Sequence, residues 1–423
     1  MNADLGETSR PEAIPAVRPT VRSGRGGARL RLAALAAVLP LALAACGGDK
    51  DGGGSGDAKP KGPSQAAVHI SPKDGAHGVD PAGGLKVEAA KGKLVKVEVT
   101  GKGGKISGKY ASGHTSWKPS GHLATGHDYR VSAVAKDSKG RTTSKHAKFS
   151  TLSPQHPVVG RYTPEDGQKV GVGMPVSINF NRPVSHREDV EKSVSVSADP
   201  EVDVQGHWFG DQRLDFRPEK FWKKGTKVSV RLNLDGVEAQ DGVYGTQDKT
   251  VKFTVGRSQV SVVDAKSKQM VIKRDGKKYR KIPISSGSDE HPTYNGKMVI
   301  SEKHRVTRMD GNTVGFGRKE EAGGYDIKDV PHAMRLSDSG TFIHGNYWNP
   351  PYSFGHSNLS HGCVGLRDPR GGGDPKAPGA WFYRHSMLGD VVQVKNSHDQ
   401  TIQPDNGFSD WNMSWKKWTA DQK

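Results

Sequence analysis

Cysteine is scarce in this sequence: its 423 residues include only two, Cys46 and Cys363. Two thiols exclude a disulfide-stapled framework and a zinc module built on paired cysteines. Aromatic residues are also few, at 7%, whereas glycine is abundant, with 54 residues. Acidic side chains number 45 against 63 Lys and Arg, which gives a formal net charge of +18. This composition favours several small β-rich modules, and the charge favours an anionic neighbour.

The N-terminal segment contains a short apolar run, residues 32–45, preceded by four arginines between positions 22 and 31. The run is too short to span a bilayer as a stable anchor and is typical of a secretory signal. It ends in Leu-Ala-Ala-Cys-Gly, which resembles a lipobox. We therefore expect residues 1–45 to be removed, Cys46 to be lipidated, and the protein to be exported and held on the outer face of the cytoplasmic membrane.

Short alternating runs separated by turn residues fill the middle of the chain. A Gly-, Lys- and Asp-rich tether is expected at 46–65, followed by two β-sandwiches of Ig size at 66–153 and 154–256. The two sandwiches repeat each other, since residues 70–75 and 162–167 both contain Pro-x-Asp-Gly. The repeat favours a rigid stalk, with direct contact to a wall polymer as the alternative.

A third β-rich module is expected at 257–396. Apolar runs at 260–263, 270–272 and 279–284 predict strands, and residues 273–276 have the composition of a hairpin turn. Glycine-rich residues 309–325 predict a long loop of the kind that forms lids. One helix is expected around 381–385.

The C-terminal extension, residues 397–423, contains Trp411, Trp415 and Trp418 at helical spacing. We expect these rings to form one face of a short helix packed on the third module. Binding of glycan by exposed tryptophans is the alternative interpretation.

The third module contains Cys363, and with Cys46 lipidated this thiol is unpaired in an exported protein, which indicates reactivity. A thiolate is the nucleophilic form, and a neighbouring imidazole lowers a thiol's pKa. In an extended segment, His361 would share a face with Cys363 and lie beside the sulfur. His344 is far enough away in sequence to face the thiol from a neighbouring strand. Flanking glycines leave backbone N–H groups open to a developing oxyanion.

Two other interpretations of this segment exist. A lone cysteine is often a small buried hydrophobe, and a lone histidine is often a hydrogen-bonded core residue. A zinc site made from His344, His361 and Cys363 lacks a fourth ligand in ordinary spacing. Two histidines and several glycines around one thiol favour catalysis, and we expect no metal and no cofactor.

The pattern His-Gly at 344–345, then Ser-His-Gly-Cys-Val at 360–364 with Leu366, resembles the active-site signature of the L,D-transpeptidases, which cross-link bacterial peptidoglycan. The wider arrangement is similar to actinobacterial lipoproteins of this family, which have tandem Ig-like domains before a YkuD-like catalytic domain. The resemblance implies a mainly β fold: two Ig-like β-sandwich modules, a β-rich catalytic domain and a short Trp-rich tail.

The resemblance also implies roles for individual residues. Cys363 would be the nucleophile and His344 its base, oriented by the backbone carbonyl of Gly345. Backbone N–H groups around Gly362 and Cys363 would form the oxyanion hole, and His361 would orient the thiol or pack beneath it.

Substrate contacts follow from the same resemblance, and one position departs from it. The expected contacts are Tyr325, Ser339, Gly340, Ser360 and Arg367. Phe316 is the alternative to Tyr325 for the aromatic residue of the lid. The family usually has Arg or Asn after Cys-Val, where this chain has Gly365, so that side chain's function would come from elsewhere, with Arg367 as the candidate.

The expected function is formation of 3-3 cross-links between peptidoglycan stem peptides through a cysteine acyl-enzyme, with release of D-Ala. Alternatives are an L,D-carboxypeptidase, attachment of a protein to peptidoglycan by the same thiol, and a non-catalytic wall-binding lipoprotein. Expected partners are a donor tetrapeptide, an acceptor amine, the membrane through Cys46, and anionic wall polymers, with no nucleic acid.

Overall fold

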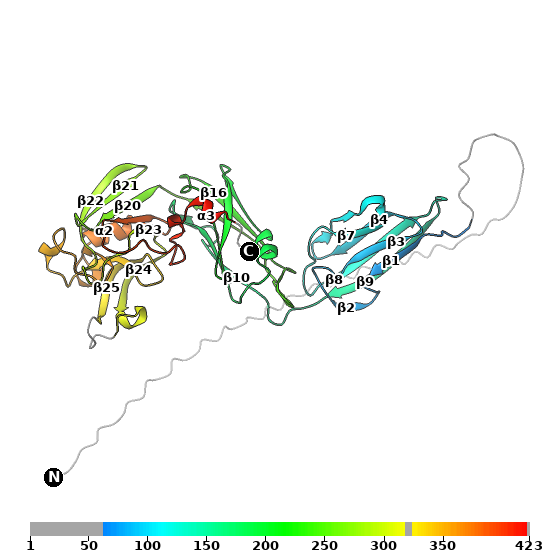
Figure 1. Cartoon of the computed structure of the whole chain (residues 1–423), viewed down its shortest axis with the longest axis horizontal. Coiled ribbons are helices and arrows are strands. Elements are labelled where there is room, and N and C mark those ends of the chain that lie inside the picture. Colours follow the sequence, from blue (N-terminus) through cyan, green and yellow to red (C-terminus); the bar gives the residue numbers. More distant parts are fainter. Residues whose placement is uncertain (1–61, 318–323, 421–423) are drawn as a thin grey trace, which may run out of the picture. The chain divides into compact units, whose positions relative to one another are not determined.

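A computed structural model describes residues 62–317 and 324–420 of the chain. Strands dominate these residues, as the sequence predicts (Figure 1). The expected signal segment, Cys46 and nearly all of the tether lie outside the described residues. Within the described ranges, no helix is both long enough and apolar enough to cross a membrane.

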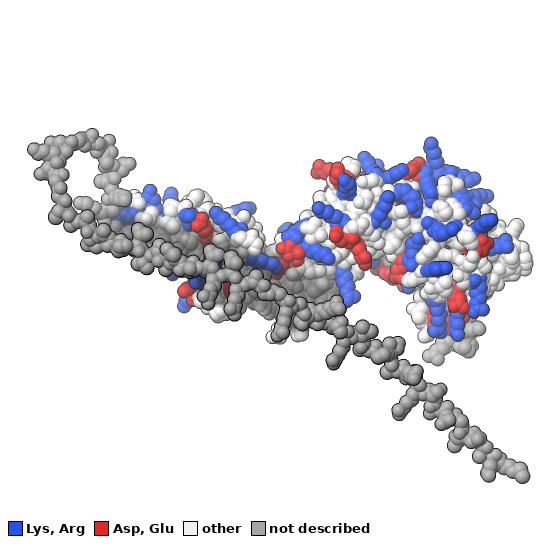
Figure 2. All heavy atoms as spheres, turned by 180° about the vertical axis from the view of Figure 1, so that it is seen from behind, with Lys and Arg blue, Asp and Glu red and all other residues white. Residues whose placement is uncertain are grey.

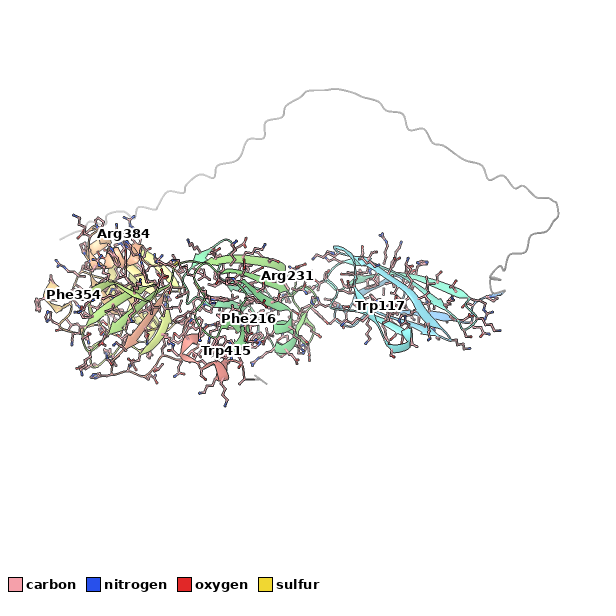
Figure 3. All side chains as sticks on the ribbon, turned by 90° about the horizontal axis from the view of Figure 1, so that it is seen from above. Trp117, Phe216, Arg231, Phe354, Arg384 and Trp415 are labelled. Atoms are coloured by element: carbon pink, nitrogen blue, oxygen red, sulfur yellow. The ribbon has the colours of Figure 1, made fainter. Side chains whose placement is uncertain are left out.

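The first Ig-like module is a sandwich of two sheets, ordered β1-β3-β7-β6 and β2-β9-β8-β4-β5. In β8, alternate residues are buried, because successive side chains of a strand point to opposite faces. Trp117 and Tyr129 lie in the core between the sheets (Figure 3 shows Trp117). The strands are β1 (Ala67–Ser71), β2 (Ala76–Val79), β3 (Lys86–Ala90), β4 (Lys93–Gly101), β5 (Gly104–Lys105), β6 (Gly108–Tyr110), β7 (Ser116–Pro119), β8 (Asp128–Lys136) and β9 (Thr142–Thr151).

The second Ig-like module has its own core, between sheets ordered β10-β12-β15-β14 and β11-β19-β16-β13. Phe216 lies in this core (Figure 3). The elements are β10 (Gly160–Thr163), β11 (Lys169–Val170), β12 (Val176–Phe180), α1 (Arg187–Lys192), β13 (Val194–Asp199), β14 (Val204–Phe209), β15 (Arg213–Pro218), β16 (Lys227–Asn233), β17 (Glu238–Gln240), β18 (Val243–Tyr244) and β19 (Asp248–Val255).

The sequence repeat corresponds to a repeated structural detail. Asp74 accepts a hydrogen bond from the N–H of Lys148 at 2.8 Å, and Asp166 accepts one from Lys252 at 2.8 Å. The glycine after each aspartate, with φ of 78° and 75°, donates to the same lysine's carbonyl. Each Asp-Gly turn therefore fixes the start of a module to its last long strand, and positive φ explains the glycine.

The third module is a nine-stranded sheet, ordered β23-β28-β20-β21-β22-β27-β26-β25-β24. The predicted strands are present, and the predicted hairpin turns at Asp275-Gly276, where both residues have positive φ. The elements are β20 (Gln259–Asp264), β21 (Gln269–Arg274), β22 (Lys277–Ser285), β23 (Gly296–Val299), β24 (Glu302–Asp310), β25 (Asp326–Arg335), β26 (Phe342–Asn346), β27 (Val364–Arg367), α2 (Pro378–Arg384) and β28 (Val391–Lys395).

The C-terminal extension differs from its prediction. It forms a short 3-10 turn, η5 (Asp410–Asn412), and a single helical turn, α3 (Trp415–Trp418), because Met413 between them is extended. The three tryptophan rings surround the buried Arg217 of β15, at 4.9 Å for Trp411, 5.5 Å for Trp415 and 4.2 Å for Trp418. The rings therefore pack on the second Ig-like module, whereas the earlier part of the extension packs on the third module as expected, with Ile402 in that module's core.

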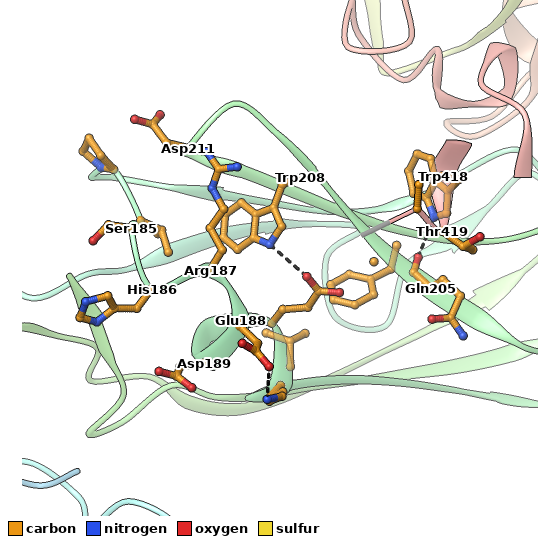
Figure 4. A pocket seen from close by; sticks show the side chains of 18 of the residues that line it. Ser185, His186, Arg187, Glu188, Asp189, Gln205, Trp208, Asp211, Trp418 and Thr419 are labelled. Atoms are coloured by element: carbon orange, nitrogen blue, oxygen red, sulfur yellow. Dashed lines mark hydrogen bonds and ion pairs between the residues drawn. The ribbon is translucent and has the colours of Figure 1, made fainter. Parts of the chain in front are cut away.

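Hydrogen bonds fix this extension at both ends. Asn412 exchanges bonds with the backbone of Lys297 in β23, at 2.8 Å each. Trp418 donates its indole N–H to the carbonyl of Gln205 at 2.9 Å (Figure 4). The extension thus joins the third module to the second. The helical spacing of the tryptophans in the sequence does not reveal this connection.

Candidate active site

Strands β26 and β27 bring the predicted histidine and thiol into one part of the sheet. They run parallel, with Ile343 beside Val364 and His344 beside Gly365. Cys363 comes directly before β27, and its sulfur accepts a hydrogen bond from the N–H of Phe342 at 3.4 Å. Both strands are short buried runs, which is typical of strands inside a sheet.

The Cys363 thiol is buried and held in its protonated form. Its sulfur lies 3.6 Å from the carbonyl oxygen of Gly340, to which the S–H donates. Burial raises the pKa of this thiol to about 11, against the lowering effects of the Phe342 N–H and of the charge on Arg335. The resting thiol is therefore neutral.

His344 is also buried and neutral. Its Nδ1 donates to the carbonyl of Gly345 at 2.9 Å, which leaves Nε2 as the basic nitrogen. The Trp348 ring stacks on the imidazole, with centroids 5.4 Å apart and planes 17° from parallel. Burial lowers the pKa of His344 to about 4, opposed by the Gly345 carbonyl. Histidine and thiol are both uncharged at neutral pH.

Ser360 and Gly362 shape the turn before the thiol. Ser360 donates its hydroxyl to the carbonyl of Cys363 at 2.5 Å and accepts the N–H of Gly362 at 3.2 Å. Gly362 has φ of 108°, a conformation that side chains disfavour. The extended conformation that was expected to place His361 beside the sulfur is therefore absent.

His361 instead packs within a group of aromatic rings. It stacks on His291 with centroids 5.0 Å apart, and it contacts Tyr325 at 5.1 Å and Phe316 at 5.5 Å. The loop around Pro292 lies against Gly362 and carries His291 into this group. Tyr325 and Phe316 come from the expected lid segment, so both lid candidates reach the same histidine.

The lid segment begins with a 3-10 turn, η2 (Gly311–Val314), after β24. Residues 318–323 of the predicted loop lie outside the described residues. Val314 packs directly on Gly340, where a Cβ would meet its methyl carbon at 2.3 Å. Burial raises the pKa of Tyr325, and Cys363 adds to that effect. The described part of the lid thus contacts the backbone beside the thiol.

Ser339 and Gly340 occupy the turn before β26. The Ser339 hydroxyl bonds to Asn406 at 2.8 Å and to Ser337 at 3.1 Å. Gly340, with φ of 93°, presents its carbonyl to the thiol. Their expected substrate contacts stay predictions.

Arg367 is exposed at the far end of β27, in register with Asn346. The arginine whose charge lowers the pKa of Cys363 is Arg335, at the end of β25. Arg335 lies 4.6 Å from the Phe342 ring and forms an ion pair with Glu302 at 3.1 Å. Sequence reasoning missed Arg335 because only strand pairing brings residue 335 next to residue 342.

The nitrogen atoms and rings nearest the thiol are engaged in other contacts. Among the described residues, no group of three or more His, Cys, Asp or Glu side chains is arranged to hold one. His344 uses Nδ1 on a carbonyl, and His361 packs among rings.

A large groove of about 1350 Å³ lies elsewhere, on the second Ig-like module (Figure 4). Its lining includes α1, Trp208 and the last described residues, up to Ala420. Trp208 donates to Glu191 at 3.1 Å. None of the lining residues comes from the third module, so this groove is separate from the thiol.

Two protein families match the chain. A bacterial Ig domain family matches residues 76–238, and an L,D-transpeptidase catalytic domain family matches residues 258–394. The chain is 32% identical over 348 residues to L,D-transpeptidase 2 of Mycobacterium tuberculosis, covering 82% of each chain. It is 29% identical over 402 residues to L,D-transpeptidase 5 of the same organism, covering 93% of this chain and 84% of that one.

A solved structure described as an LD transpeptidase in complex with imipenem is 28% identical, covers 57% of this chain and all of that one, and has a TM-score of 0.48. The family matches and the strands define the class: a mainly β protein with an Ig-like region followed by an L,D-transpeptidase catalytic domain. The chain belongs to the L,D-transpeptidase family. The predicted family and fold class are confirmed.

Proposed function

We propose that this chain is a peptidoglycan L,D-transpeptidase that forms 3-3 cross-links between stem peptides through an acyl-enzyme on Cys363. The observation that carries the proposal is the pairing of β26 with β27. One of these strands contains His344, whose Nδ1 is fixed by a hydrogen bond, and the other begins directly after the Cys363 thiol. This arrangement supports a histidine acting on the thiol. Family membership supports acyl transfer as the reaction class.

In the first step, the Cys363 sulfur attacks the carbonyl of the diamino acid in a donor tetrapeptide. Because both groups rest neutral, the thiol proton passes to Nε2 of His344 as the carbon–sulfur bond forms. The carbonyl oxygen gains negative charge, which N–H groups near Gly362 and Cys363 would stabilise. The bond to D-Ala then breaks, and the imidazolium protonates the leaving amine, so that a thioester remains.

In the second step, the side-chain amine of an acceptor stem attacks the thioester. His344 takes a proton from that amine and returns it to the departing sulfur, so that the thiol and neutral imidazole are restored. The products are one new amide bond and one free D-Ala for each cross-link. Water in place of the amine would make the enzyme a carboxypeptidase.

The setting of the reaction is also part of the proposal. Residues 1–45 would direct export, and lipid on Cys46 would hold the enzyme at the outer face of the cytoplasmic membrane, facing the wall. Lys and Arg outnumber Asp and Glu on the visible face in Figure 2, which supports contact with an anionic wall polymer.

The β21–β22 hairpin is the best candidate for that contact. Six of the nine residues from 273 to 281 are Lys or Arg. Among the described residues, Lys277, Lys278, Arg280 and Lys281 form no ion pair. β22 pairs with β27 only through its last two residues, so most of this edge has no neighbouring strand. An extended anionic chain would therefore meet unpaired cations along an open edge.

Product analysis tests the proposed reaction. The purified soluble region is incubated with disaccharide-tetrapeptide beside Cys363→Ala, and products are identified by mass spectrometry. A dimer formed with loss of D-Ala, absent in the variant, is expected. Tripeptide alone would replace the proposal with a carboxypeptidase. Unchanged substrate in both samples would contradict catalysis on this peptide and favour a wall-binding role.

A further inference from the structure

Asn346, two residues after His344 on β26, has a side chain that the reaction described above does not use. Residues i and i+2 of a strand share a face, so Asn346 lies on the same face as His344. Asn346 is 2% exposed, although its side chain is polar. A buried amide normally has partners for both its oxygen and its nitrogen.

The amide oxygen is fully engaged. Oδ1 accepts the backbone N–H of Trp348 at 3.2 Å and that of Asn349 at 2.9 Å. Two N–H donors on one side identify that atom as the oxygen, so Nδ2 points the other way. This arrangement also holds the turn that places the Trp348 ring on His344.

The amide nitrogen points to Gly365. A Cβ built on Gly365 would lie 3.2 Å from Nδ2 of Asn346, 3.4 Å from its Cβ and 3.3 Å from the carbonyl of Ser285. Gly365 is in register with His344 and two residues after Cys363. Its φ is not in the left-handed region, so conformation does not require glycine there. The space taken by Asn346 explains the glycine.

Nδ2 makes no hydrogen bond with any residue in the described ranges 62–317 and 324–420. Nδ2 is not among the fully enclosed atoms that lack a partner, so a small part of it stays open to an incoming acceptor. A donor that loses water without gaining an acceptor carries a desolvation penalty. Its position, beside the residue that pairs with His344, makes an acyl-donor peptide the natural source of that acceptor.

We infer that the Asn346 side chain binds substrate. Its amide N–H group, which lies beside Gly365, donates a hydrogen bond to a carbonyl or carboxylate oxygen of the stem peptide that acylates Cys363. This inference rests on the proposed function. It assigns to Asn346 the contact that Gly365 cannot make, in place of Arg367, whose side chain is exposed at the far end of β27.

The test separates the role of the Asn346 amide nitrogen from the role of its oxygen, which holds the turn at Trp348 and Asn349. Asn346→Ser removes the amide nitrogen but keeps an oxygen that can accept backbone N–H groups in a turn. Asn346→Ser/Gly365→Asn returns an amide from the neighbouring strand. Asn179→Ser, at an exposed position of β12 in the second Ig-like module, is the control. Each variant is compared with the wild type for kcat/KM on disaccharide-tetrapeptide and for thermal stability.

We expect Asn346→Ser to keep its melting temperature and to lose about 10- to 100-fold in kcat/KM, since a hydrogen bond to a charged or developing oxygen is of that size. The double variant is expected to recover about tenfold of this loss, while Asn179→Ser stays near wild type. If Asn346→Ser unfolds, Asn346→Asp, which keeps the acceptor and the shape, is measured for the same loss.

Wild-type activity in Asn346→Ser, or a double variant no better than the single one, would overturn the inference. A wild type that forms neither dimer nor tripeptide would instead contradict the proposed function. The two failures are therefore distinguishable.

Discussion

At the residue scale, the main feature of this site is that its two reactive groups rest uncharged. Burial lowers the pKa of His344 to about 4 and raises that of Cys363 to about 11. A thiolate–imidazolium ion pair would require the opposite shifts. The S–H of Cys363 also has an acceptor, the carbonyl of Gly340. In the proposed mechanism, the proton would therefore pass from Cys363 to His344 during attack, and no preformed thiolate would be used.

The pH dependence of thiol alkylation tests this neutral pair. Iodoacetamide reacts with the thiolate, so its rate on Cys363 is expected to rise about tenfold per pH unit until the pH approaches the thiol's pKa. Acylation by tetrapeptide needs neutral His344, so it should fall only as pH drops toward about 4. Fast alkylation that is constant from roughly pH 5 to 8 would indicate an ion pair and contradict this account.

The charge on Arg335 can be tested by substitution, with Arg367 as the control arginine. The charge on Arg335 lowers the pKa of Cys363, so Arg335→Gln should slow alkylation at pH 8 about threefold, the size of a weakly screened charge effect. Arg367→Gln should leave alkylation unchanged. Stopped alkylation followed by mass spectrometry measures both rates, and equal slowing by the two variants would be the opposing result.

The sequence indicated Cys363 and His344 as candidate catalytic residues, because an unpaired thiol, histidines and flanking glycines rarely occur together for structural reasons alone. It indicated the surroundings less well. His361 was expected beside the sulfur from strand alternation, but the positive φ of Gly362 breaks that alternation. Trp348, Arg335 and Asn346 reach the site through turns and strand pairing, which no short motif encodes.

At the element scale, the strands were predictable and the contacts between modules were not. Alternation in β8 and β16, and the Asp-Gly turn of the β21–β22 hairpin, follow from local sequence. The tail was predicted as one helix because its tryptophans have helical spacing. Arg217, nearly 200 residues earlier, gathers those rings around its guanidinium, and such a distant partner is invisible to periodicity.

The tail also contains a buried carboxyl, Asp410, that lies near an arginine and a second buried carboxyl of the second Ig-like module. Asp410 is fully buried, with Arg213 at 3.7 Å, and Arg213 also pairs with the buried Asp215. Burial, and then the charge of Asp215, raise the pKa of Asp410. A raised folded-state pKa means that the contribution of Asp410 to stability is present at low pH and lost as pH rises through that pKa.

Asp410→Asn is therefore expected to raise the melting temperature above that of wild type, by about 2–4 °C at pH 9 and by less at pH 6. Asp405→Asn, at an exposed position of the same tail, serves as the control and should change little. Differential scanning calorimetry at the two pH values measures the difference. A variant less stable than wild type at pH 9 would show that the charged carboxylate stabilises the tail.

Neutralising the hairpin tests its proposed wall contact. Lys277→Gln/Lys278→Gln/Lys281→Gln should weaken sedimentation with purified anionic wall polymer by about tenfold, with a reduced salt dependence. The matched control is the same change at Lys93, Lys96 and Lys145 of the first Ig-like module. Equal loss in both triple variants would indicate net charge alone, and retention in the hairpin variant would exclude this surface.

At the scale of the whole molecule, two modules of similar construction precede one that contains the thiol. The matching Asp-Gly turns of the Ig-like modules show that the sequence repeat is a structural repeat. The tail then bonds to both β23 and the second module. The second Ig-like module therefore contributes packing partners to the catalytic domain's extension and is more than a spacer.

Intact-protein mass spectrometry of the soluble region during turnover of disaccharide-tetrapeptide, followed by peptide mapping, is the most direct test of acyl transfer through Cys363. We expect an adduct on Cys363 equal to the donor minus D-Ala, which disappears when acceptor amine is added and is absent in Cys363→Ala. Continued cross-linking by Cys363→Ala, or an adduct on another residue, would contradict it.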